Sequence, residues 1–371
     1  MGMGSRRRWL AVAAVLGLLV VIATFGPRAW ENIRRATRDG ATVDLGDGWF
    51  EATVPARPHR VPLTSEHEIL EMGNTITFRY RRNELGFRGP ETELMQPPGT
   101  YRVTALGASE VFGVGVDEDE TFMALLGTRL AGRSGGPPLE TVTIGVPGAT
   151  AGGLLGKLER DWAALRTDVL LICPGSGTLE SKAHAGFEPT RARLEEDEYQ
   201  RLENNYRHAT GRMIDDGRNR GARVVLMTPP VTSLFPLPDV ERFLAVAREL
   251  AAHKGCPLLD AATLFQDIEQ REGLTLDREG DLQRLAQHRG GESTVLVEAR
   301  YADPDNVQPI APEIYAFLDR EKGTAQAVSL DGNHANARGH QILADALFEL
   351  LGDEGWLPPA RIGGAPPGAN P

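Results

Sequence analysis

Five short apolar runs constrain the fold of this chain more than any other feature. They lie at residues 101–106, 141–144, 168–173, 223–228 and 257–259, and the segments between them carry apolar residues at helical spacing. Strands that alternate with helices predict a parallel sheet covered by helices on both faces, with right-handed crossovers. We therefore expect an α/β fold.

Helical periodicity is clearest in three segments. Apolar stripes at helical spacing run through residues 154–165 and 199–213, and the last one comprises Ile342, Leu343, Ala346, Leu347, Leu350 and Leu351. Between residues 274 and 330 the alternation fails, so we expect an insertion there that shapes a substrate pocket. A surface excursion without a fixed structure fits that stretch nearly as well.

The first 98 residues have a different character. Residues 1–8 are basic, residues 9–25 are an uninterrupted apolar run, and residues 26–98 mix charges and prolines with one alternating segment at 75–80. The run predicts a single-pass signal anchor with the arginines inside the cytoplasm, and cleavage of the segment stays open. A buried core helix is the alternative, although no polar residue gives this run a solvent face.

These boundaries divide the chain into a cytoplasmic segment (1–8), a transmembrane anchor (9–25), a stalk with a small β-rich lead-in (26–98), a catalytic-type domain (99–355) and a Pro/Gly-rich disordered tail (356–371). The folded domain is then expected to lie outside the cytoplasm.

Composition limits the partners. The net charge is −11, so nothing in the overall charge favours nucleic acid as a partner. The two cysteines, Cys173 and Cys256, lie in or beside apolar runs and fit small core residues, while a disulfide between them is compatible but unsupported. No Cys/His cluster has zinc spacing, so we expect no metal.

Ser109 follows the first apolar run, in the sequence Leu106-Gly107-Ala108-Ser109. A serine at the carboxyl end of a buried strand lies where open α/β sheets place their ligand crevice. Small residues at that point also make a tight strand-to-helix turn without any chemistry. Taken alone, the stretch 101–110 favours the turn.

His334 and Asp331 supply the groups that a nucleophilic serine needs. Acyl transfer requires a base for the hydroxyl proton and a carboxylate that orients the base. The two residues lie three positions apart just before the last helix, so the carboxylate can reach one ring nitrogen while the other faces outward. Asp331 as a helix cap is the simpler alternative, but it does not account for the histidine.

Three blocks in this order resemble the SGNH (GDSL-like) hydrolase family. The first is the stretch 107–116 around Ser109, the second is the stretch 145–150 with Gly148, and the last is the stretch 331–340, which begins Asp-Gly-Asn-His. The stretch 83–89, Asn-Glu-Leu-Gly-Phe-Arg-Gly, is similar to a lead-in of membrane-anchored members, although its Asn83 and Arg88 fit structural roles.

The resemblance implies a three-layer α/β/α sandwich with a flavodoxin-like parallel sheet. It implies a triad of Ser109, His334 and Asp331. It also implies an oxyanion hole from the backbone N–H groups of Ser109 and Gly148, helped by the Ser176 hydroxyl. Two positions depart from the family pattern: Ala108 replaces an aspartate, and Ser176 stands where an asparagine is usual. A serine hydroxyl donates one hydrogen bond but is less well aimed than an amide.

The expected function is ester hydrolysis at the cell envelope, on a lipid, a carbohydrate or a small ester, without a cofactor. O-acyl transfer to an envelope polysaccharide uses the same triad and is one alternative. A non-catalytic module that binds glycan or an envelope partner is the other, because Ala108 and Ser176 weaken the family pattern.

Overall fold

A computed structural model describes residues 41–55, 75–133, 136–175, 196–232, 238–273, 328 and 334–358. The predicted anchor at 9–25, Ser176, Asp331 and nearly all of the predicted insertion at 274–330 lie outside these residues. Among the described helices, none is long and apolar enough to cross a membrane.

The central sheet has five parallel strands. They are β4 (Tyr101–Gly107), β5 (Leu139–Gly145), β6 (Val169–Cys173), β7 (Arg223–Met227) and β8 (Leu258–Leu259). Their spatial order is β5-β4-β6-β7-β8, which is the flavodoxin-like order with the first strand inside the sheet. Every residue of β4 and β6 is buried, because helices cover both faces.

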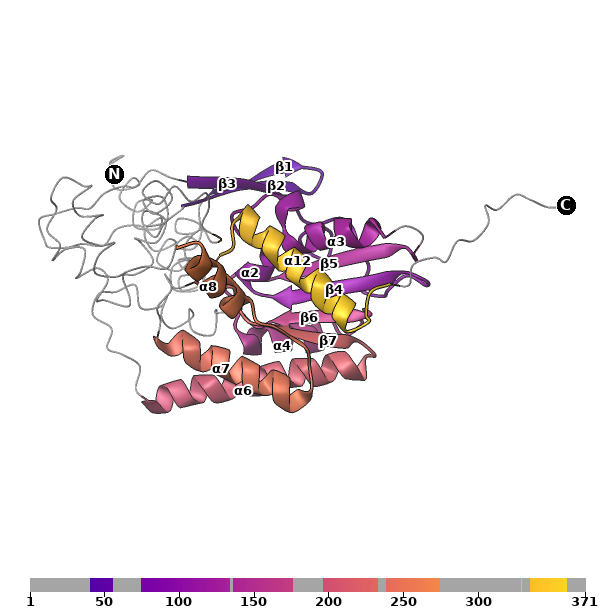
Figure 1. The fold of residues 1–371 in the computed structure, drawn as a ribbon. Coiled ribbons are helices and arrows are strands. Elements are labelled where there is room, and N and C mark those ends of the chain that lie inside the picture. The colour runs from indigo at the N-terminus through magenta and orange to yellow at the C-terminus, as the bar shows by residue number, and fades with distance from the viewer. Residues whose placement is uncertain are drawn as a thin grey trace, which may run out of the picture.

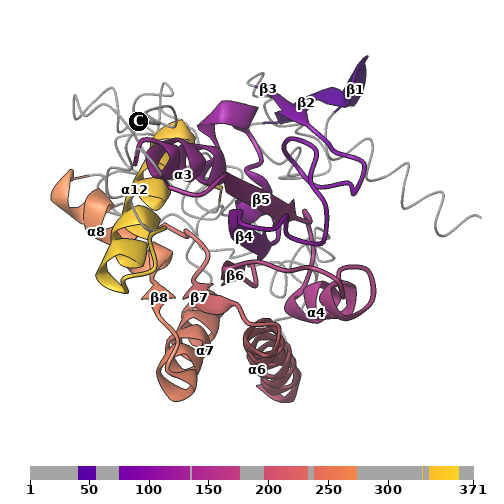
Figure 2. The same cartoon turned by 90° about the vertical axis from the view of Figure 1, so that its right-hand side faces the viewer.

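Two layers of helices enclose the sheet (Figures 1 and 2). One layer contains α3 (Phe122–Ala131), α8 (Ala261–Arg271) and α12 (Ala337–Asp353), and the other contains α4 (Ala151–Arg160), α6 (Glu196–Asn219) and α7 (Pro238–Lys254). Each layer packs its apolar side chains into a separate core on its own face of the sheet. The predicted three-layer α/β/α sandwich is therefore present.

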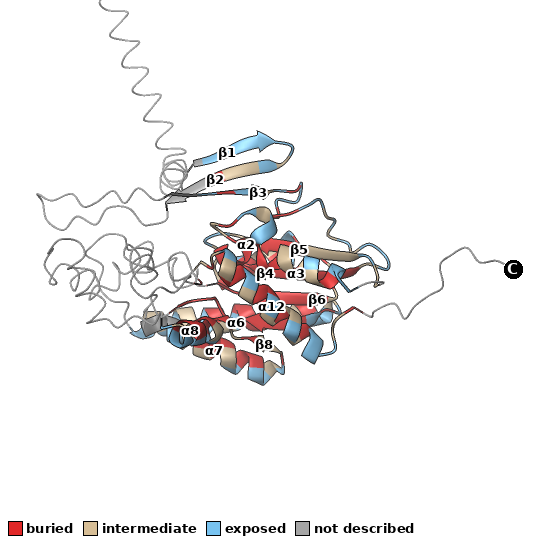
Figure 3. Ribbon diagram, turned by 45° about the horizontal axis from the view of Figure 1, so that its top comes forward, coloured by how far each residue is buried: buried red, intermediate tan, exposed pale blue. Residues whose placement is uncertain are grey.

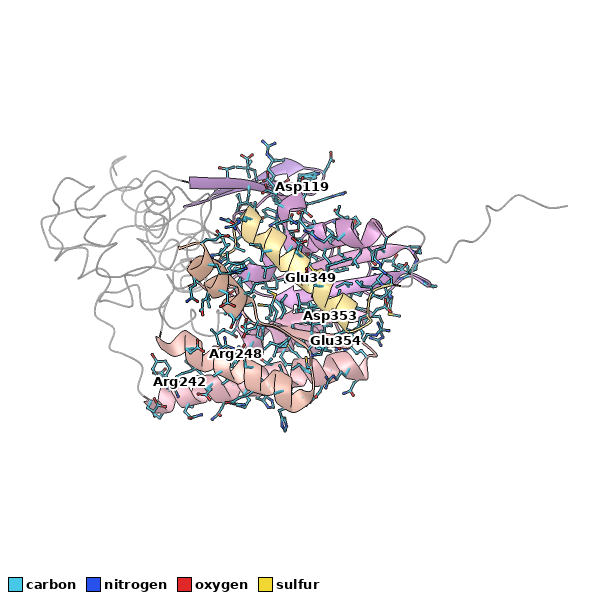
Figure 4. All side chains as sticks on the ribbon, viewed as in Figure 1. Asp119, Arg242, Arg248, Glu349, Asp353 and Glu354 are labelled. Atoms are coloured by element: carbon cyan, nitrogen blue, oxygen red, sulfur yellow. The ribbon has the colours of Figure 1, made fainter. Side chains whose placement is uncertain are left out.

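Ion pairs join helices within the second layer and also link that layer to α8 of the first layer. Arg242 of α7 pairs with Glu196 and Glu203 of α6, and Arg248, farther along α7, pairs with Asp260 at the start of α8 (Figure 4). Exposed pairs of this kind each contribute about 1 kcal/mol or less, so the apolar cores remain the main source of stability.

A second, antiparallel sheet precedes the main domain. It contains β1 (Ala41–Gly46), β2 (Trp49–Pro55) and β3 (Thr75–Arg81), in that order. We call it the lead-in sheet. β1 is its outer edge, and residues 42–46 of this strand are exposed (Figure 3).

The other edge of the lead-in sheet, β3, docks on the main domain through carboxylates. Its Arg79 and Arg81 backbone N–H groups donate to the side chains of Asp117 and Glu118, at 2.7 Å and 3.2 Å. Asp117 caps the short 3₁₀ helix η1 (Glu118–Glu120) that follows the first family-like block. The strand edge is thus covered, which protects its backbone donors from other chains.

The C-terminal boundary differs slightly from the sequence-based division. Residues 356–358, assigned to the tail, pack on the domain: the Trp356 carbonyl accepts a hydrogen bond from the Tyr101 hydroxyl, and Pro358 is buried. Cys173 and Cys256 are both buried free thiols.

Candidate active site

Ser109 lies at the carboxyl end of β4, where the chain turns into the short helix α2 (Ser109–Phe112). The turn depends on Gly107: a Cβ at that position would lie 2.4 Å from Val111 Cγ2 and 2.5 Å from the Cys173 carbonyl oxygen. No other residue fits between the neighbouring strand and the helix. Ser109 is 6% exposed, so this residue is buried at the carboxyl edge of the sheet.

Hydrogen bonds close the turn behind Ser109. Its carbonyl accepts from the backbone N–H groups of Gly113 and Val114, at 3.0 Å and 3.3 Å. Ala108 occupies the N-cap position of α2 and offers no side-chain hydrogen bond there. The helix therefore begins with backbone donors that no cap residue uses.

His334 reaches Ser109 from the far end of the chain. Its Nε2 lies 2.9 Å from Ser109 Oγ, although 225 positions separate the two residues in sequence. With the ring proton on Nδ1, Nε2 accepts the hydroxyl hydrogen bond, and this is the tautomer a general base needs. The expected meeting of Ser109 and His334 is thus present in the structure.

The start of α12 fixes the residues that carry His334, residues 334–336, which we call the histidine loop. Asn336 caps this helix by accepting a hydrogen bond from the Gly339 N–H at 2.9 Å, and its own N–H donates to the Val328 carbonyl at 3.1 Å. The cap that sequence reasoning offered as the alternative role for Asp331 is therefore filled by Asn336. Asp331 itself lies outside the described residues.

Gly339 is required by the same close approach. A Cβ on Gly339 would lie 2.1 Å from the Val328 carbonyl oxygen and 3.0 Å from Ala335 Cβ. The missing side chain lets α12 begin directly against the segment that leads to His334.

His340 is a fully buried neighbour of the site. Its Nδ1 accepts a hydrogen bond from the Phe122 N–H at 3.1 Å, and its ring stacks on the Phe122 ring. Burial, with smaller effects from the charges of Arg88 and His334, lowers the pKa of His340 to about 3. His340 is therefore neutral at ordinary pH and holds the start of α3.

An ion pair fastens the same loop to α8. Arg338 in the first turn of α12 forms two hydrogen bonds with Glu272, at the end of α8, and the one from Nη1 is 2.8 Å long. This pairing lowers the pKa of the Glu272 carboxyl. Two-point contacts of this kind fix direction as well as distance.

Gly148 lies in the loop after β5, with φ of +73°. β5 pairs in register with β4, and the Val146 N–H donates to the Gly107 carbonyl at 2.9 Å, so this loop leaves the sheet beside the Ser109 turn. After β6 ends at Cys173, the described chain continues to Gly175, one residue before Ser176.

Sequence reasoning passed over Glu110, the residue after the serine. It is 2% exposed. Burial, and next the charge of Glu110, raise the pKa of the Cys173 thiol well above its usual range. The thiol nearest the site is therefore protonated and is a poor nucleophile. The sequence alone does not show that Glu110 is buried, because an acidic residue at this position is equally compatible with exposure to solvent.

No group of three His, Cys, Asp or Glu side chains within the described part of the chain is arranged to hold a metal ion.

Comparisons with known proteins give a match to one family and several matches to solved structures. Residues 105–342 match the GDSL-like Lipase/Acylhydrolase family. A search of curated proteins found no match.

Among solved structures, the acetyl xylan esterase AlAXEase is 15% identical, with a TM-score of 0.41, over 67% of this chain and 98% of the other. A putative lipolytic protein of the G-D-S-L family from Desulfitobacterium hafniense DCB-2 is 16% identical, with a TM-score of 0.41, over 67% and 99%. A catalytic mutant of Axe2, an acetylxylan esterase from Geobacillus stearothermophilus, is 15% identical, with a TM-score of 0.43, over 68% and 94%.

Proposed function

Because the chain belongs to the GDSL-like lipase/acylhydrolase family, we propose that it is a serine ester hydrolase with Ser109 as nucleophile and His334 as base. The observation that carries this proposal is the 2.9 Å contact between His334 Nε2 and Ser109 Oγ. A neutral imidazole at this distance is within reach of the hydroxyl proton.

The reaction begins when Ser109 Oγ attacks the acyl carbonyl carbon and its proton passes to His334 Nε2. The tetrahedral intermediate then expels the alcohol, which takes that proton, and leaves an acyl-serine. Water, deprotonated by His334 in the same way, attacks the acyl-serine. The second intermediate releases the acid, and the proton on His334 Nε2 returns to Ser109 Oγ. Asp331 is proposed to accept a hydrogen bond from the Nδ1–H of His334 and so to orient the imidazole ring.

Three donors are proposed to stabilise the oxyanion: the backbone N–H groups of Ser109 and Gly148, and the Ser176 hydroxyl. Ser109 and Gly148 follow the carboxyl ends of two adjacent strands, β4 and β5. Donors aimed at the developing charge are usually the largest single contribution to such catalysis.

The substrate class is proposed to be an acyl ester of a lipid, a carbohydrate or a small alcohol at the cell envelope. The apolar run at residues 9–25 supports that location, with the catalytic domain outside the cytoplasm. The proposed mechanism uses amino-acid side chains and backbone groups alone and requires no cofactor.

The test is hydrolysis of p-nitrophenyl acetate by the purified protein. Ser109→Ala is expected to lower kcat by roughly 10⁴-fold or more, because it removes the nucleophile. Ser176→Ala is expected to lower kcat by less than about 10²-fold, because the two backbone donors remain.

Absence of turnover by the wild-type protein would contradict the proposal, as would equal turnover by Ser109→Ala. Adding a glycan acceptor separates hydrolysis from transfer. A hydrolase releases free acetate in excess of acetylated glycan, whereas an acyltransferase gives the reverse.

A further inference from the structure

Arg88 is a buried arginine from the lead-in segment that contacts the loop behind Ser109. Its side chain is 1% exposed. Nη1 donates to the carbonyls of Phe112 and Gly113, at 2.8 Å and 2.7 Å, and Nη2 donates to the Val116 carbonyl at 2.7 Å. One side chain therefore donates hydrogen bonds to three carbonyls within residues 112–116.

The segment that Arg88 holds, residues 112–116, is the one that closes the serine turn. Gly113 donates its N–H to the Ser109 carbonyl and offers its own carbonyl to Arg88. A shift of this segment therefore moves the backbone of Ser109, and with it the hydroxyl that faces His334. Only one hydrogen-bonded residue lies between the guanidinium and the nucleophile.

The surroundings of Arg88 keep its guanidinium in place. Its Nε donates to Glu118 Oε2 at 3.0 Å, and the same carboxylate oxygen accepts from the Arg81 N–H of β3. The guanidinium carbon lies 5.2 Å from the centre of the Phe112 ring and 5.6 Å from that of Tyr80. Planar cations favour such aromatic faces, so the lead-in sheet and α2 enclose Arg88 from both sides.

A lysine cannot reproduce this arrangement. Its ammonium group offers three donors from one point, whereas the guanidinium spreads its donors over a rigid fork. Arg88 reaches a carboxylate on one side and three carbonyls on the other, and a point charge can serve only part of that set.

We propose that Arg88 is a positioning residue for ester hydrolysis, which fixes residues 112–116 and thereby aims Ser109 Oγ at His334. This rests on the hydrolase function proposed above. The segment that carries Arg88 is then part of the catalytic unit, and the lead-in sheet supports the active site rather than serving only as a spacer.

Arg102 provides a matched control at the opposite end of the sheet. It is 0% exposed and likewise pairs with one carboxylate, Glu140, and with three carbonyls, those of Leu94, Met95 and Arg166. It lies at the start of β4, whereas Ser109 follows the end of that strand. The two arginines share burial and bonding and differ in their relation to the serine.

The experiment compares Arg88→Lys with Arg102→Lys in the full-length protein, by thermal unfolding and by steady-state hydrolysis of p-nitrophenyl acetate. Both variants are expected to lower Tm. Arg88→Lys is also expected to lower kcat by roughly tenfold or more with KM within about twofold of wild type, because a small misplacement of the nucleophile affects the chemical step. Arg102→Lys is expected to leave kcat within about twofold.

A second pair of variants, with smaller changes, keeps the test decisive if either lysine variant fails to fold. Glu118→Gln and Glu140→Gln each weaken one arginine's anchor, and the two side chains are similarly exposed, at 22% and 20%. Only Glu118→Gln is expected to lower kcat, by roughly threefold or more at unchanged KM.

If both variants of a pair fold and have equal kcat, the positioning role of Arg88 is overturned. An inactive wild-type protein would instead overturn the proposed function, so the two failures are distinguishable.

Discussion

Individual residues near the candidate site divide into those proposed to react and those that hold them in place. His334 lies in contact with Ser109, whereas His340, six residues later, accepts the Phe122 N–H inside the core. Both are histidines of one sequence block, yet burial keeps the second neutral. The environment, not the residue type, decides which of them is placed to act as a base.

His340 makes stability depend on pH. Its pKa is about 3 in the folded protein against an ordinary value of 6.5, so the unfolded chain binds the proton more readily. The stabilisation is therefore complete above pH 6.5 and is lost as the pH falls towards 3. Between pH 7 and pH 5 this group alone costs about 2 kcal/mol of unfolding free energy.

Urea unfolding at pH 7 and pH 5 checks this expectation. His340→Gln keeps a hydrogen-bond acceptor for Phe122 without a titrating ring, so it should lose about 2 kcal/mol less than wild type over the same interval. If both proteins lose the same free energy, His340 is not the group responsible.

Sequence patterns predicted the residues at the site better than their supports. Ser109 and His334 were found because each stands at an element boundary inside a recognisable block, and the structure brings the two together. Arg88 was assigned a structural role, and the sequence could not show that its partners are the carbonyls behind the serine, because backbone acceptors leave no mark in composition. Asp331 and Ser176 stay predictions.

At the scale of elements, the approach of α12 to its neighbours sets the position of the histidine loop. Gly339 in the first turn of α12 lies against the Val328 carbonyl, while Gly152 in the first turn of α4 has open space around it. The same substitution at these two helix starts should therefore have opposite effects.

Gly152→Ala is expected to raise the free energy of unfolding by roughly 0.5–1 kcal/mol, because alanine favours a helix over glycine. Gly339→Ala is expected to lower it, and to reduce ester hydrolysis as well, because α12 must move away from the segment that precedes His334. Thermal unfolding and p-nitrophenyl acetate turnover measure both effects. A Gly339→Ala protein with wild-type stability and turnover would show that the close approach is not maintained in solution.

At the scale of the whole molecule, the sequence predicted the main domain well. The five expected strands are present within two residues of their predicted ends, because buried parallel strands are nearly continuous apolar runs. The lead-in sheet was less predictable, because only the alternating segment at 75–80 stood out. β2 is recognisable mainly by its pairing with that segment, and β1 by its pairing with β2. Short exposed edge strands carry little periodicity of their own.

The same parallel sheet places the proposed reacting groups at one edge. Ser109 and Gly148 follow adjacent strands, and His334, which precedes α12, contacts Ser109 at the same edge. Ligands of open α/β sheets bind at the carboxyl ends of the strands, and this arrangement is what the proposed hydrolysis uses.

The most direct measurement is covalent trapping with a fluorophosphonate, followed by mass spectrometry of the intact protein and of its peptides. The account predicts one phosphonyl group per molecule, located on Ser109, with a labelling rate that falls by at least roughly 10²-fold in His334→Gln because the base is lost. Ser109→Ala should take up no label. A wild-type protein that stays unlabelled, or that carries the label on another residue, would contradict the assignment of Ser109 as the nucleophile.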